Sequence, residues 1–136
     1  MQELRAIQML SEPAREFLSD VSLAVNTPEA AEFLLQQLEL THFSTPRAGE
    51  YLRHVALNVA PERMTALVSP LEMITGAPLA QRIALADGLN QAARQRGISL
   101  PEAATAWTRR VVLEGTRYRR RCYSQDGYRK RARSEV

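Results

Sequence analysis

The chain has 136 residues, of which 45% are hydrophobic and 24% are charged, and it contains one cysteine, Cys122. This size and composition are typical of one soluble globular domain, and a single cysteine excludes an intramolecular disulfide or a thiolate metal cluster within one chain. No apolar run approaches the roughly 18 residues of a membrane span and no signal peptide is recognisable, so we expect a soluble, cytoplasmic protein.

The net charge of +3 is unevenly distributed along the chain. Residues 117–136 contain eight cationic and two acidic residues, a net +6, which leaves −3 for residues 1–116. We therefore predict a helical body over 1–116 and a basic, disordered tail over 117–136. Such a tail contacts nucleic acid, an acidic partner or an anionic surface, or alternatively is only a solubilising extension. The candidate contact residues in this tail are Arg117, Arg119, Arg120, Arg121, Arg129, Lys130, Arg131 and Arg133.

Prolines mark the predicted helix starts, because proline suits the first helical turn, where its missing N–H would have no partner. They form two interleaved series. The first series has spacings of 33 and 32 residues and comprises Pro13, Pro46 and Pro78. The second has spacings of 33 and 40 residues and comprises Pro28, Pro61 and Pro101. The chain is rich in good helix formers, so the prolines predict six helices in three hairpins.

The first three predicted helices each have an apolar stripe at helical spacing. Ser11, Thr27 and Thr45 stand where an N-cap hydroxyl is expected. The stripe of the first helix comprises Phe17, Val21, Ala24 and Val25. That of the second comprises Ala30, Phe33, Leu34 and Leu38. That of the third comprises Ala48, Tyr51, Leu52, Val55, Ala56 and Val59.

The later helices are less regular. Pro70 predicts a break or bend near Val68 in the fourth segment. The fifth helix ends at Gly97, after the basic residues Arg94 and Arg96, and its stripe comprises Leu79, Ile83, Ala86, Leu89 and Ala93. The last helix has Ala104, Trp107 and Val111 on its apolar face, and its extent beyond Gly115 is open.

These features predict an all-α fold, a right-handed stack of about three antiparallel helical hairpins in the manner of an α-solenoid. A single hairpin cannot bury both of its apolar stripes, but neighbouring hairpins cover one another. The alternative is a compact six-helix bundle.

The motifs TPEAAEFLLQQLE and TPRAGEYLRHVALNV resemble HEAT-like helical repeats. They are similar to the repeats of large multidomain bacterial proteins that also contain propeller-type dehydrogenase-like and c-type haem domains. The resemblance covers about Ala14–Val112 and implies a repeat segment cut or split from a longer chain. The haem signature of two cysteines followed by histidine is absent, so no cofactor is carried over.

The residues of common catalytic and metal sites form no convincing constellation. His42 and His54 are the only histidines, and a metal site needs three or four ligands. The six glycines are never clustered into a phosphate-binding loop, and no strained nucleophile turn surrounds a serine. We therefore expect no enzyme activity, no metal and no cofactor.

The sequence thus favours a non-enzymatic interaction scaffold that binds a protein or peptide partner, with its oligomeric state open. A first alternative is nucleic-acid binding through the tail, where arginines pair with phosphates and Tyr118, Tyr123 and Tyr128 stack on bases. A second alternative is a spacer in a larger extracytoplasmic protein, with exposed apolar residues such as Leu4, Ile7 and Leu10 at its end.

Overall fold

A computed structural model of the chain describes residues 9–74 and 76–134, with the backbone alone beyond Tyr123. Within these residues every regular element is a helix, which confirms the predicted all-α class. In chain order the elements are α2 (Glu12–Ala24), α3 (Pro28–Leu40), α4 (Ala48–Asn58), the 3-10 helix η1 (Pro61–Leu67), α5 (Val68–Met73), α6 (Leu79–Arg96) and α7 (Glu102–Ser134). None of the described helices is long and apolar enough to cross a membrane.

Most helix ends follow the local signals. The hydroxyl of Thr27 accepts a hydrogen bond from the N–H of Ala30 at 3.3 Å, with Pro28 as the first residue of α3. Gly97 ends α6 with a φ of 63°, and the following N–H, of Ile98, donates to the carbonyl of Ala93 at 3.1 Å. Glycine adopts this left-handed conformation without a Cβ penalty, so the predicted end of α6 is confirmed.

Three other signals act less directly. The N-cap position of α2 is Ser11, as predicted, but its side chain makes no capping hydrogen bond. Helix α4 begins two residues after Pro46, at Ala48. Pro70 lies in the first turn of α5, just after the change from 3-10 to α geometry at Val68, which is the predicted break.

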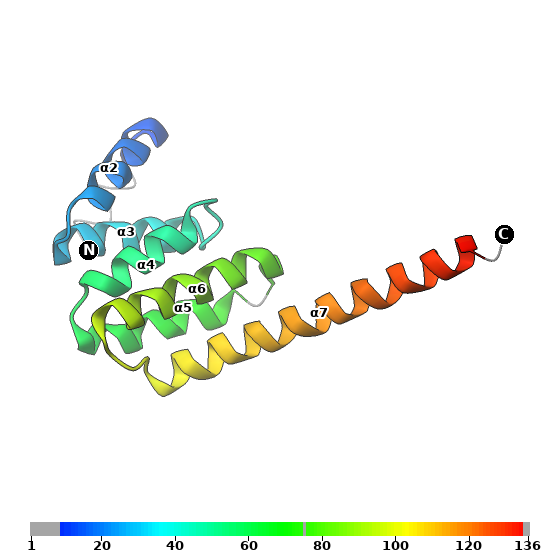
Figure 1. Cartoon of the computed structure of the whole chain (residues 1–136). Coiled ribbons are helices and arrows are strands. Elements are labelled where there is room, and N and C mark those ends of the chain that lie inside the picture. Colours follow the sequence, from blue (N-terminus) through cyan, green and yellow to red (C-terminus); the bar gives the residue numbers. More distant parts are fainter. Residues whose placement is uncertain (1–8, 75, 135–136) are drawn as a thin grey trace.

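Helices α3, α4, α6 and α7 each pack against the next, with α2 against α3 at one end (Figure 1). Helix α5 contacts η1 and the first part of α7. The predicted stripe of α4 is buried along its whole length, because α4 lies between α3 and α6. The largest fully buried side chains are Leu34, Leu38, Leu52, Val55, Leu67, Leu71, Leu85 and Leu89.

The backbones of α4 and α6 approach each other closely at two glycines. A Cβ added to Gly88 would lie 2.5 Å from the carbonyl oxygen of Gly49, and one added to Gly49 would lie 2.8 Å from the carbonyl oxygen of Ala84. Both clashes are with backbone atoms, which cannot move aside as a side chain can. Any residue larger than glycine therefore pushes the two helices apart.

A side chain of α6 also binds the carbonyl groups at the C-terminal end of α4. One guanidinium nitrogen of Arg96 donates to the carbonyl oxygens of Ala56 and Val59, both at 2.9 Å. The last carbonyls of a helix have no partner within the helix, and they carry partial negative charge. Arg96 therefore ties the C-terminus of α6 to that of α4.

Helix α7 runs without interruption from Glu102 to Ser134, where a disordered tail was predicted from residue 117 onward. No proline follows Pro101, and arginine is a good helix former, so nothing in this stretch stops the helix. Neither Gly115 nor Gly127 ends it. Trp107, with Ala104 and Val111, is buried against the body as predicted.

We expect Gly88→Ala to destabilise the fold by about 1–3 kcal/mol, the usual cost of overpacking, despite the gain in helix propensity. Gly115→Ala is the matched control, since Gly115 is also helical and its added Cβ meets only the side-chain end of Ile83, at 3.3 Å. Its effect should be neutral or stabilising by up to about 1 kcal/mol. Urea denaturation measures both, and equal effects would contradict the close crossing.

We expect Arg96→Met to lower the free energy of unfolding by about 1–3 kcal/mol, because two half-buried carbonyls lose their donor. Arg94→Met removes an exposed arginine from the same last turn of α6 and should change stability by no more than about 0.5 kcal/mol. Thermal unfolding followed by circular dichroism compares the two variants. Similar losses of stability in the two variants would mean that the positive charge at the end of α6 stabilises the fold, and that the two hydrogen bonds of Arg96 do not.

Candidate functional site

The apolar face of α2 is exposed, although the sequence predicted it as core. Phe17 is 67% exposed, Val21 45% and Val25 41%, and the only buried residue of α2 is Ser19. The prediction was wrong because α2 packs extensively only against α3, and no described element covers its outer side. We call the surface formed by Phe17, Leu18, Val21 and Val25 the α2 apolar face.

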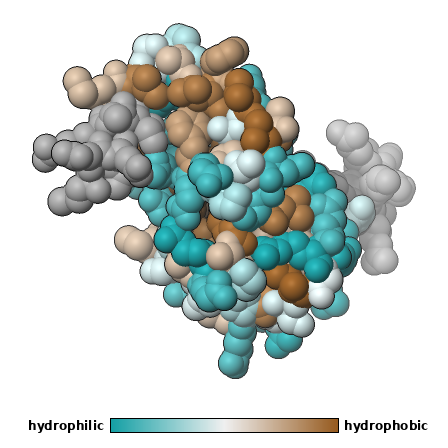
Figure 2. Space-filling view, turned by 90° about the vertical axis from the view of Figure 1, so that its left-hand side faces the viewer, coloured by the Kyte–Doolittle hydropathy of each residue, from teal (hydrophilic) through white to brown (hydrophobic). Residues whose placement is uncertain are grey.

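Figure 2 views the molecule from the left-hand side of Figure 1. It shows apolar side chains gathered over the upper part of the molecule, where α2 lies. Scattered apolar side chains are normal on a protein surface, but a contiguous group on one helix commonly marks an interaction site. The sequence signal for this group was the helical stripe itself. Periodicity shows that a face is apolar without showing what covers it.

Arg47 connects α2 to the beginning of α4. It forms ion pairs with Asp20 of α2 and with Glu50, the latter at 2.8 Å, and its guanidinium carbon lies 5.5 Å from the ring centre of Tyr51. The hydrogen bonds to Glu50 and then to Asp20 raise the pKa of Arg47 above its ordinary value. Arg47 therefore stays charged, and α2 is oriented by a link that no local sequence pattern indicates.

A second link holds the C-terminal end of α2. The Nε2 atom of His54, on α4, lies 3.1 Å from the carbonyl oxygen of Val25. His54 is buried, so its role is to anchor the connection between α2 and α3. His42 follows the C-terminus of α3, and it is exposed on a loop that Phe43 anchors in the core. Among the described residues no three potential metal ligands come together.

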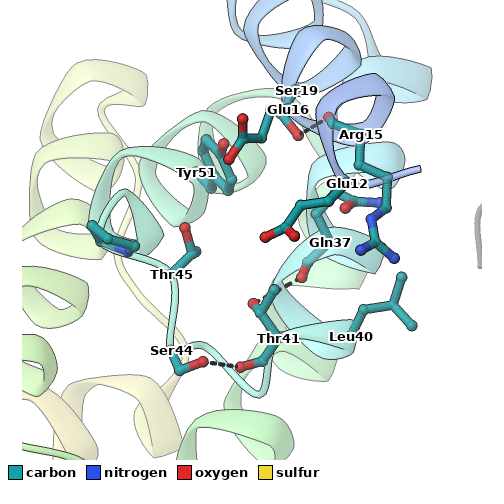
Figure 3. A pocket seen from close by; sticks show the side chains of 11 residues that line it. Glu12, Arg15, Glu16, Ser19, Gln37, Leu40, Thr41, Ser44, Thr45 and Tyr51 are labelled. Atoms are coloured by element: carbon teal, nitrogen blue, oxygen red, sulfur yellow. Dashed lines mark hydrogen bonds between the residues drawn. The ribbon is translucent and has the colours of Figure 1, made fainter. Parts of the chain in front are cut away.

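A polar pocket of about 270 Å³ lies beneath α2, between α2, α3 and the start of α4 (Figure 3). The carboxylates of Glu12 and Glu16 point into it, toward Thr45 and Tyr51. The wall on the α3 side includes Gln37, which is only 6% exposed and whose Nε2 atom has no partner within the described protein. The pocket can accept hydrogen bonds from a donor and attract a cation.

Some of the hydroxyl groups around this pocket are already engaged in hydrogen bonds to backbone carbonyls. Ser19 donates to the carbonyl of Arg15 at 2.8 Å, and Thr41 donates to the carbonyl of Gln37 at 2.9 Å. The lining contains no histidine or cysteine that could act as base or nucleophile beside them. The pocket is thus suited to binding, as a polar margin next to the α2 apolar face.

The predicted basic contact residues lie at the opposite end of the molecule. Arg117, Arg119, Arg120 and Arg121 are exposed on the part of α7 that projects from the body (Figure 1). The side chains of Arg129, Lys130, Arg131 and Arg133 lie outside the described residues, as do Tyr128, Leu4 and Ile7. Leu10, the third apolar residue expected at the N-terminal end, is half-buried.

The beginning of this projecting segment of α7 is bound to α6 by an ion pair. Arg82 binds both carboxylate oxygens of Glu114, at 2.6 and 2.9 Å, and also donates to the carbonyl of Ala77 at 3.0 Å. The hydrogen bonds from Arg82 lower the pKa of Glu114 below its ordinary value. The direction in which α7 leaves the body is therefore set at this pair.

Comparison of the chain with protein-family models, with curated proteins and with solved structures found no match.

The Arg82–Glu114 pair should make stability depend on pH. Because the pKa of Glu114 is lowered by folding, the stabilisation is complete above its unfolded pKa of about 4.3 and is lost as the pH falls through the lower folded pKa. The midpoint of thermal unfolding of Glu114→Gln should lie below that of the wild type at neutral pH and approach it in acid. The effect is small because Glu114 is exposed.

Glu39→Gln, which changes an exposed carboxylate of α3, is the control and should keep a constant offset from the wild type over the same pH range. A constant offset for Glu114→Gln as well would contradict the assigned pair.

Proposed function

We propose that this protein is a non-enzymatic scaffold of stacked, HEAT-like helical hairpins that binds a protein or peptide partner at the α2 apolar face. The observation that carries the proposal is the outward orientation of Phe17 and Val21 on adjacent turns of a helix whose neighbours bury their stripes. Hydroxyls, carboxylates and an amide around the adjoining pocket supply the polar margin that protein interfaces have around an apolar centre.

The size of the apolar residues supports a binding role. Burying one large apolar side chain completely contributes about 1.5–3 kcal/mol, and aromatic residues are common among the anchors of interfaces. Phe17 is the most exposed member of the α2 apolar face and its only aromatic residue. Its capture in a partner's pocket would provide much of the binding free energy.

The contacts between the second and third predicted hairpins agree with the stacked arrangement. In a stack of hairpins, equivalent helices of neighbouring hairpins contact each other. Helix α4 packs on α6 and α5 packs on α7, as the first and second helices of the second and third hairpins should. Helix α2 is then the first helix of the terminal hairpin, and its open face is where a stack presents a surface to another molecule.

The second candidate is nucleic-acid binding through the projecting part of α7. The observation that favours it is the exposure of four arginines and of Tyr118 and Tyr123 on one helical segment. Arginine pairs with phosphate, and tyrosine stacks on unpaired bases. The acidic balance of residues 1–116 limits such binding to this segment.

Site-specific photo-cross-linking in cells tests both candidates. A photoreactive amino acid at Phe17 should give one predominant protein adduct, identified by mass spectrometry, and Val21→Asp on the same chain should abolish it. The control position is Thr65, an exposed residue of η1 away from α2. Equal adducts at Phe17 and Thr65 would refute the α2 binding site. Nuclease-sensitive adducts from Tyr118 would support the second candidate.

A further inference from the structure

Two unpartnered surfaces with complementary chemistry lie at opposite ends of this molecule. One is the α2 apolar face, and the other is the exposed segment Val112–Tyr123 of α7. After Glu114, α7 extends away from the body on the side opposite α2 (Figure 1), so these surfaces cannot meet within one chain. They can meet only between two copies.

The segment of α7 combines apolar and cationic side chains. Val112 and Tyr123 are eleven residues apart, about three helical turns, so they lie on the same side of the helix. Arg119 lies between them on that side, with Arg120 beside it. All four side chains are exposed, so this side of the helix presents two apolar groups separated by positive charge.

The face of α2 has the opposite charge around its apolar residues. Glu16 immediately precedes Phe17, and Asp20 immediately precedes Val21, so both carboxylates border the α2 apolar face along one edge. Asp20 is paired with Arg47, so the charge that this edge offers to a partner comes from Glu16. Glu12 lies one turn before Glu16 and points, like Glu16, into the polar pocket (Figure 3). A basic helix with apolar residues matches this surface in both charge and hydrophobicity.

We propose that the α2 apolar face of one copy binds the Val112–Tyr123 segment of α7 of a second copy, head to tail. This inference rests on the proposed binding function of α2 and names its partner. The symmetric alternatives are unfavourable, because pairing two α2 faces brings the Glu16 carboxylates of both copies together, and pairing two α7 segments brings their arginines together. Only the head-to-tail pairing places opposite charges opposite each other.

A head-to-tail contact leaves one α2 face and one α7 segment free at the two ends of every assembly that has not closed into a ring. Further copies can add at either end, so the assembly grows with concentration and does not stop at a dimer. Its ion pairs lie at an exposed edge and are weakened by salt.

Light scattering coupled to size-exclusion chromatography tests the proposal on the full chain. At low salt the mass of the wild type should rise with concentration beyond that of a dimer, and it should return to the monomer at high salt. Phe17→Ser with Val21→Ser removes the α2 side of the contact. Arg119→Glu with Arg120→Glu removes the α7 side. All four positions are exposed, and circular dichroism verifies that both variants fold.

Each double variant alone should remain monomeric, but an equimolar mixture should form a pair of twice the monomer mass and nothing larger, because only one intact contact can form. Met73→Ser with Arg109→Glu, also at exposed positions but outside both surfaces, should assemble like the wild type. A wild type that stays monomeric, or a mixture that forms no pair, overturns the proposal.

The photo-cross-linking result separates this inference from the function on which it rests. A Phe17 adduct with α7 of a second copy supports both. A Phe17 adduct with a different protein overturns the head-to-tail pairing and leaves the α2 binding site standing. The absence of a selective adduct overturns both.

Discussion

The crossing of α4 and α6 is the constraint on which the remaining structure depends. At Gly49 and Gly88 the two backbones touch without intervening side chains. This close approach buries the apolar stripe of α4 and brings the end of α6 within reach of the α4 carbonyls that Arg96 binds. Helix α3 then covers the other side of α4, and α7 covers the other side of α6. The centre of the row is therefore dry and closely packed.

The two ends of this series of helices are attached differently: α7 buries Trp107 and Val111 in the shared core, whereas α2 buries only Ser19 and is oriented by polar links. Arg47 and His54 tie α2 to α4 through an ion pair and a hydrogen bond, and Arg82 ties α6 to α7 through Glu114. Such links orient a helix without covering its apolar face. Because α2 is attached in this way, its hydrophobic side remains open, which is the physical basis for assigning binding to it.

Acidic and basic residues are separated along the molecule, in the direction in which α2, α3, α4, α6 and α7 pack one after another. The acidic edge of α2 lies at one end and the arginines of α7 project from the other (Figure 1). This polarity, together with apolar residues at both ends, is the basis of the proposed head-to-tail pairing. The two uses considered for α7, contact with nucleic acid and contact with another copy, depend on the same exposed arginines and therefore compete.

The sequence alone determined the helical class, the apolar stripe of α4, the capped start of α3 at Thr27 and the end of α6 at Gly97, since these depend on periodicity and on hydrogen bonds within a few residues. It could not show that the stripe of α2 stays exposed, because periodicity identifies an apolar face and not its neighbour. The local signals around Gly115 also left the length of α7 open. Only the tertiary structure decided that Gly49 meets Gly88 and that Arg47 meets Asp20, because these residues are distant in the chain and their contacts exist only once the helices have packed.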